Sequence, residues 1–288
     1  MAKRMQQSRE EEIERYLRTG EYDADSRAWP GPNFIERGRN ADAALRKALI
    51  EEVRRRAPHA TRPEQLADLD VAAFTRAKVA PMVRGLFARA EQETVLDVLG
   101  ASVIFLTPAT VDTVLDQMPW LGTAWDLANL YLAGCDAPLL AEDAPYLLGL
   151  SEGTTCYVSA EYFAAPGRFD DFVVHEAAHI FHNCKRATIG LRGTRRRECL
   201  LEIAFAKRET FAYACEAYSR IQELGDSPRA RGMLLAEHER GRRPPDERVD
   251  ADEYFDILQE AVAARNGWKR ILARCSPSAP TRARHGAA

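Results

Sequence analysis

Two histidines and a glutamate stand within five residues of one another, in the segment His175-Glu176-Ala-Ala-His179, which is flanked by apolar residues. If this segment is helical, residues four apart lie about 40° apart around the axis, so that His175 and His179 point the same way. Two imidazoles placed in this way can hold one metal ion. Glu176, about 100° round from His175, can reach a water on the open side of that ion. The pattern therefore predicts a catalytic metal site, with Zn²⁺ as the expected ion.

A catalytic zinc site needs a third protein ligand. A helical pattern from about Arg197 to Leu224 carries three glutamates seven residues apart, and therefore roughly on one face: Glu202, Glu209 and Glu216. Seven residues span about 10 Å of helix axis, so at most one of them can bind the metal. We expect Glu209, because it lies in an apolar stretch where a carboxylate is costly to bury unless a cation neutralises it. Glu216 and then Glu202 remain the alternatives.

The segment His175-Glu-Ala-Ala-His-Ile-Phe-His182, followed by Glu209-x-x-Ala212, resembles the gluzincin superfamily of metallopeptidases. Within that superfamily it is similar to the ImmA/IrrE-type cytoplasmic metallopeptidases, and the likeness covers residues 154 to 220. The metzincin pattern is excluded, because it requires glycine at position 182 and histidine at position 185, where the chain has His182 and Lys185.

The resemblance implies a zinc metallopeptidase that hydrolyses a peptide bond in a protein or peptide substrate. Glu176 would be the general base, and a tyrosine or histidine would stabilise the oxyanion. Tyr213, one turn beyond Glu209, is the candidate for the second role. We expect His182, on the same face as the two ligands, to be structural. The alternative function is a catalytically silent zinc-binding scaffold or interaction module, but a purely structural site has no need of Glu176.

The patterns predict an α+β fold that is mostly helical, with a zincin-like core, a small mixed sheet and an active-site helix. Residues 102–106 read as a strand, and residues 146–150 and 154–159 as a hairpin. The strand 154–159 is the candidate edge to which an extended peptide substrate would add. Pro81 is expected to separate two helices. Further helices are expected over 5–18, 40–57, 82–98, 109–118, 124–133, 228–240 and 251–265.

The same patterns predict three parts of the chain: a helical N-terminal region over 1–98, a zincin-like domain over 99–275 and a disordered tail over 276–288. The net charge of −3 gives no reason to expect nucleic acid or an anionic membrane as a partner. The N-terminus lacks the apolar core of a signal peptide, and no apolar run is long enough to span a bilayer. Six cysteines without a paired spacing indicate reduced thiols. These features predict a cytoplasmic protein.

Overall fold

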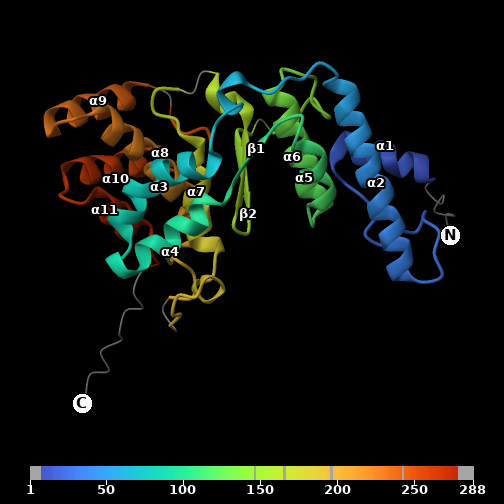
Figure 1. The fold of residues 1–288 in the computed structure, drawn as a ribbon, viewed down its shortest axis with the longest axis horizontal. Coiled ribbons are helices and arrows are strands. Elements are labelled where there is room, and N and C mark those ends of the chain that lie inside the picture. The colour runs from blue at the N-terminus through green and yellow to red at the C-terminus, as the bar shows by residue number, and fades with distance from the viewer. Residues whose placement is uncertain (1–7, 146, 165–166, 195–196, 242, 278–288) are drawn as a thin grey trace, which may run out of the picture. The chain divides into compact units, whose positions relative to one another are not determined.

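The computed structural model describes residues 8–145, 147–164, 167–194, 197–241 and 243–277, and these are mainly helical with one small sheet (Figure 1). The expected α+β class is confirmed at this level. None of the described helices combines the length and the apolar character needed to cross a membrane. The tail expected to be disordered lies outside the described residues from residue 278 onwards.

The chain forms two compact units, each built from several segments. Unit 1 comprises Met1–Leu69, Ile104–Leu150 and Tyr157–Pro166, and unit 2 comprises Asp70–Val103, Ser151–Cys156 and Gly167–Ala288. This division differs from the single boundary expected after residue 98. The reason is that the helices over residues 71–100 pack against helices from the second half of the chain.

Unit 1 is a group of helices around a hydrophobic core. Its helices are α1 (Arg9–Thr19), α2 (Phe34–Arg56), α5 (Val111–Gln117) and α6 (Leu121–Gly134). The helix α2 packs against α1, α5 and α6, and the core includes Leu45, Leu49, Leu115 and Leu127, all fully buried. The hydroxyl of Tyr16 on α1 donates to the carbonyl of Leu121 at 2.8 Å, which fixes α1 to the start of α6.

Unit 2 carries the histidine motif on a helix that is buried almost all round. Its helices are α3 (Val71–Leu86), α4 (Arg89–Gly100), α7 (Phe172–Asn183), α8 (Arg208–Leu224), α9 (Pro228–Arg240), α10 (Ala251–Ala263) and α11 (Gly267–Cys275). The helix α7 packs against α8 and α3. The ring of Phe181 on α7 lies 5.3 Å from that of Phe87 and 6.4 Å from that of Phe211. The apolar residues around the motif therefore hold α7 in the core of the unit.

The sheet has three strands, β1 (Val103–Leu106), β2 (Gly149–Glu152) and β3 (Thr155–Ser159), in the order β1-β3-β2. The expected hairpin is present, and its turn contains Gly153 in the left-handed region at φ 59°. Because β3 lies between the other two strands, both of its edges are already hydrogen-bonded. The expectation that residues 154–159 offer a free edge to a substrate is therefore wrong.

Two expected helix boundaries are also wrong. The helix predicted from residue 197 begins only at Arg208, because the N–H groups of Leu200 and Leu201 donate to carbonyls at the C-terminal end of α7. Those bonds satisfy carbonyls that a helix end leaves without an intrahelical partner. Pro81 does not separate two helices but lies inside α3, where it is exposed while residues on either side, such as Val79 and Val83, are buried. Packing on both sides outweighs the one missing hydrogen bond.

Candidate metal centre

The helix α7 begins after an aspartate that caps its first turn. Asp171 is the N-cap, and its side chain accepts a hydrogen bond from the N–H of Val174 at 3.3 Å. The second carboxylate oxygen of Asp171 lies 3.0 Å from Nζ of Lys78, a residue of α3. This cap fixes the first turn of α7, from which His175 and Glu176 project.

The structure brings together the three residues expected to bind a metal. Nε2 of His175 lies 3.3 Å from Nε2 of His179, and Oε2 of Glu209 lies 3.8 and 3.5 Å from these two nitrogens. Among the described residues, these three form the one group of side chains that could hold a metal ion. Their side chains are between 11 and 18% exposed, so the cluster is largely sheltered from solvent but not fully buried.

These distances fit a small tetrahedral ion. Ligands bound to zinc at about 2.0–2.2 Å stand roughly 3.4 Å from one another when the angles are tetrahedral. The observed separations of 3.3, 3.5 and 3.8 Å lie close to that value. Two imidazoles and one carboxylate are also a ligand set typical of catalytic zinc, which leaves a fourth position for water.

Glu216, the first alternative as third ligand, holds the far side of His175 instead. One of its carboxylate oxygens lies 3.0 Å from Nδ1 of His175, and the other accepts the N–H of Asp171 at 2.7 Å. Glu216 lies two helical turns beyond Glu209 on α8, so it reaches the opposite nitrogen of the same ring. With Nδ1 engaged by Glu216, Nε2 of His175 is the nitrogen available to a metal.

Glu202, the second alternative, lies outside α8 and away from the cluster. Its Oε1 accepts the N–H groups of Glu198 and Cys199 at 2.7 and 3.0 Å. It therefore stabilises the turn that precedes Leu200 and Leu201, and it offers no oxygen to the histidines.

The pair formed by His175 and Glu216 retains a proton above neutral pH when no metal is bound. Burial by itself would lower the pKa of His175, but the hydrogen bond and the charge of Glu216, together with Glu176 and Glu209, outweigh it and raise that pKa to about 9. Burial also raises the pKa of Glu216. A metal ion that binds Nε2 must therefore displace a proton.

Glu176 is buried beside the ligands, with a relative exposure of 6%. Burial raises its pKa, and the two histidines offset this in part. Within the described part of the chain its carboxylate makes no hydrogen bond. A carboxylate with a raised pKa next to a metal position has the properties of a proton acceptor.

Tyr213 lies against the first histidine, as its position one turn after Glu209 suggested. Its ring centre is 4.5 Å from that of His175, in an edge-on arrangement. Burial, followed by the charges of Glu216, Asp246 and Glu209, raises the pKa of the phenol, which therefore keeps its proton and remains a donor.

His182 is buried, and its ring lies edge-to-face with that of His179, with 5.4 Å between the ring centres. Burial is the main reason why its pKa falls to about 3, so the ring is neutral. Its Nδ1 has no hydrogen-bond partner among the described residues. Two other aromatic residues of the unit, Tyr218 and His238, make contacts with Trp268 and with the hydroxyl of Tyr254, respectively.

Two further residues of the site, Asp246 and Arg248, were not predicted from the sequence and come from the segment between α9 and α10. Nη2 of Arg248 lies 3.1 Å from Oε1 of Glu209 and 2.6 Å from Asp246. No periodicity connects this segment to the motif. The only signal was a group of charged residues directly after Pro244-Pro245, in a segment that otherwise reads as a helix breaker.

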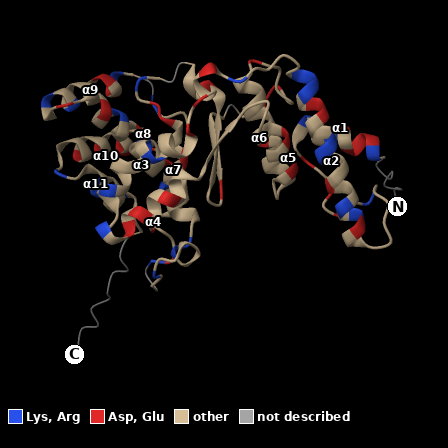
Figure 2. Cartoon of the chain, viewed as in Figure 1, with Lys and Arg blue, Asp and Glu red and all other residues tan. Residues whose placement is uncertain are grey.

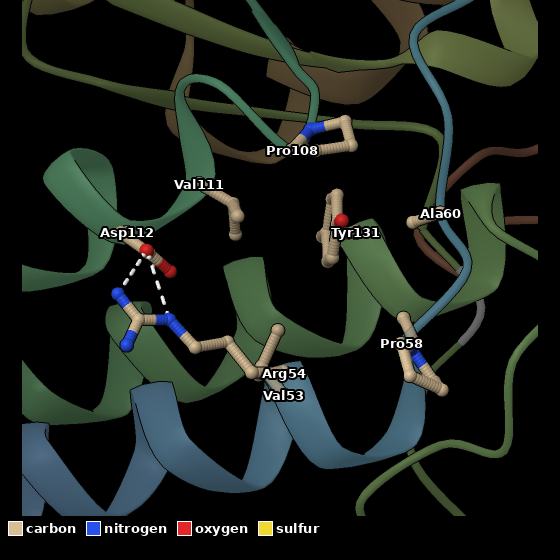
Figure 3. A pocket seen from close by; sticks show the side chains of 9 residues that line it. Val53, Arg54, Pro58, Ala60, Pro108, Val111, Asp112 and Tyr131 are labelled. Atoms are coloured by element: carbon tan, nitrogen blue, oxygen red, sulfur yellow. Dashed lines mark hydrogen bonds and ion pairs between the residues drawn. The ribbon is translucent and has the colours of Figure 1, made fainter.

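Acidic and basic residues are interspersed over the helices of each unit and are not gathered by sign (Figure 2). A pocket of about 220 Å³ lies in unit 1, between the end of α2, the start of α5 and Tyr131 of α6 (Figure 3). The ion pair of Arg54 with Asp112 stands at one side of it. This pocket contains none of the residues singled out from the sequence.

No protein family matches the chain. Comparison with curated proteins and with solved structures likewise finds no match. The function is therefore argued from the geometry of the site itself.

Proposed function

We propose that the protein is a zinc-dependent peptidase that hydrolyses a peptide bond in a protein or peptide substrate. The observation that carries this proposal is the convergence of His175, His179 and Glu209 beside the buried carboxylate of Glu176. A site that only stabilises the fold closes its coordination sphere with protein ligands. Three ligands with a carboxylate next to them are instead what hydrolysis requires.

Each residue has a role that follows from its contacts. A zinc ion in this position supplies a Lewis acid that makes water a nucleophile near neutral pH. Glu176 takes the proton of the attacking water and passes it to the leaving amine. Glu216 holds the ring of His175 in the orientation and tautomer that a ligand needs. Tyr213 donates a hydrogen bond to the oxyanion that develops on the substrate carbonyl.

Metal analysis and the Glu176→Gln variant test the proposal together. We expect about one zinc per chain in both the parent and the variant. A degenerate library of short peptides should be cleaved by the parent, with a loss of at least about 100-fold in the variant. Glu209→Gln should lose the metal, whereas Glu202→Gln should retain both metal and activity.

Two other outcomes would contradict the proposal in different ways. Zinc in the parent without cleavage of the library or of an unfolded protein would indicate a silent zinc-binding scaffold. A parent protein that binds no zinc would overturn the metal centre as well as the activity.

A further inference from the structure

Arg248 stands beside the metal position, although it belongs to a different segment from the ligands. Its Nη2 lies 3.1 Å from Oε1 of Glu209, while Oε2 is the oxygen closest to the two histidines. The side chain of Arg248 is 70% exposed and that of Glu209 is 18% exposed. The guanidinium therefore stands on the solvent-exposed side of Glu209, at the margin of the ligand cluster.

This arginine is fixed in place, unlike a typical surface arginine. Asp246 accepts bonds from Nε at 3.0 Å and from Nη2 at 2.6 Å, and also from the backbone N–H of Arg248 at 2.8 Å. The next residue, Val249, is buried, and Asp250 caps α10 through the N–H of Glu253. The backbone on both sides of Arg248 is thus anchored, and little conformational entropy is left to lose when the guanidinium binds a ligand.

The guanidinium still has donors to offer. Nε and Nη2 are engaged by Asp246 and Glu209, but Nη1 has no partner among the described residues. The carboxylates beside it are those of Glu209 and Asp246, which would repel a negatively charged group that lacked a cation to bind. A planar cation with free N–H groups is suited to a carboxylate oxygen.

We infer that Arg248 binds a carboxylate of the substrate and directs hydrolysis to peptide bonds close to a negative charge. That carboxylate is either the free C-terminus of the substrate or the side chain of an aspartate or glutamate next to the scissile bond. The inference rests on the proposed peptidase function for the reaction, but not for the binding of the carboxylate itself.

A peptide library prepared in two forms separates the two sources of the carboxylate. One form has free C-terminal carboxylates and the other has C-terminal amides, and cleavage sites are identified by mass spectrometry. We expect the zinc-loaded parent to cleave bonds close to a carboxylate about 10- to 100-fold faster than matched neutral bonds. A preference confined to the first form indicates the C-terminus, and a preference for aspartate and glutamate in both forms indicates a side chain.

Three variants test the role of Arg248. In each, the quantity measured is the rate of cleavage close to a carboxylate divided by the rate at matched neutral bonds. Arg248→Gln should bring the ratio close to one, whatever its absolute rate. Arg248→Lys should retain part of the preference, because it keeps the charge but not the planar donor group. Arg243→Gln is the matched control, since Arg243 lies in the same segment, is 68% exposed, and pairs with Asp252 only at 3.8 Å. It should keep the full preference.

A binding measurement separates failure of this inference from failure of the proposed function. Zinc-loaded Glu176→Gln is titrated by calorimetry with N-acetylglycine and with N-acetylglycinamide. We expect the acid to bind at least about 10-fold more tightly than the amide. Adding Arg248→Gln should abolish this difference, and adding Arg243→Gln should not.

The outcomes are distinct. If the parent cleaves neither form of the library, the peptidase proposal fails while the calorimetry still decides the role of Arg248. If the parent cleaves both forms without preference, the inference is overturned and the peptidase proposal stands. A preference for the acid that survives Arg248→Gln would also overturn it, because the metal alone would then account for recognition.

Discussion

At the scale of single residues, the most consequential contact is that of Glu216 with His175. Glu216 is no ligand, yet it decides which nitrogen of His175 faces the metal position and how firmly that ring holds a proton. It is tied in turn to the N-cap residue of α7 through the N–H of Asp171. One carboxylate thus couples the start of the motif helix to the first ligand of the cluster.

If the cluster binds zinc as proposed, this coupling should make the affinity for zinc depend on pH. Because the pKa of His175 is raised to about 9 in the metal-free protein, zinc must displace a proton at any lower pH. The apparent affinity for zinc should therefore rise about tenfold per pH unit from neutral pH and level off above about pH 9. Competition with a chelator of known affinity at several pH values measures this.

Glu216→Gln removes the charge that raises the pKa of His175, so the dependence on pH should flatten in this variant. At about pH 9 its affinity for zinc should be roughly 10- to 100-fold weaker than that of the parent, because the ring of His175 is held less firmly. Glu202→Gln serves as the control and should follow the parent. If the affinity of the parent for zinc did not change between pH 7 and pH 9, His175 would not hold the proton that zinc is expected to displace.

At the scale of helices, the position of α3 in unit 2 depends on a close approach to α11. A Cβ added to Gly85 would lie 2.2 Å from Cδ1 of Trp268, and the side-chain amide of Asn266 donates to the carbonyl of Gly85 at 3.0 Å. No other residue is small enough for this crossing. Since α3 also packs against α7, the crossing helps to position the helix that carries the histidines.

Gly85→Ala should therefore lower the free energy of unfolding by about 1–3 kcal/mol, even though alanine favours a helix. Gly232→Ala in α9 is the matched change, because an added Cβ there meets nothing within 4 Å. It should raise the free energy of unfolding by roughly 0.5–1 kcal/mol. Chemical denaturation of both variants gives the two changes in the free energy of unfolding. If both changes had the same sign and size, the contact between residue 85 and Trp268 would not require a glycine.

The local patterns of the sequence were sufficient to predict the motif helix and the hairpin. They also favoured Glu209 over Glu216 and Glu202, because the cost of burying a carboxylate can be judged from its neighbours in sequence. The start of α8 could not be predicted in this way. It depends on hydrogen bonds from Leu200 and Leu201 to the end of α7, which are formed only in the folded unit.

The place of Arg248 was beyond prediction for the same reason. Its approach to Glu209 depends on how α8, α9 and α10 pack together, and no spacing in the sequence encodes that packing. The central position of β3 likewise depends on which strands pair, because alternation along one strand does not say whether it lies at an edge.

At the scale of the whole molecule, the proposed binding of zinc should stabilise one of the two units and not the other. All three ligand residues belong to unit 2, on α7 and α8. Zinc at about 1,000 times its dissociation constant should stabilise the folded state of that unit by about 4 kcal/mol. We expect hydrogen exchange to slow in peptides from α7 and α8, with little change in α2 and α6 of unit 1. Hydrogen-exchange mass spectrometry with and without zinc measures this, and equal protection of both units would contradict it.

The segmental construction of unit 2 also has a consequence for the timing of its assembly on the ribosome. The helix α3 is made early, but α7, α8 and α11, against which it packs, emerge much later. At ordinary rates of synthesis the interval from α3 to α11 is roughly 10 to 40 s, during which the apolar face of α3 lacks these partners. The three ligands cannot be presented together in their final packing until most of the chain has been made. Loading of the metal is therefore expected to be a late event in the biogenesis of this protein.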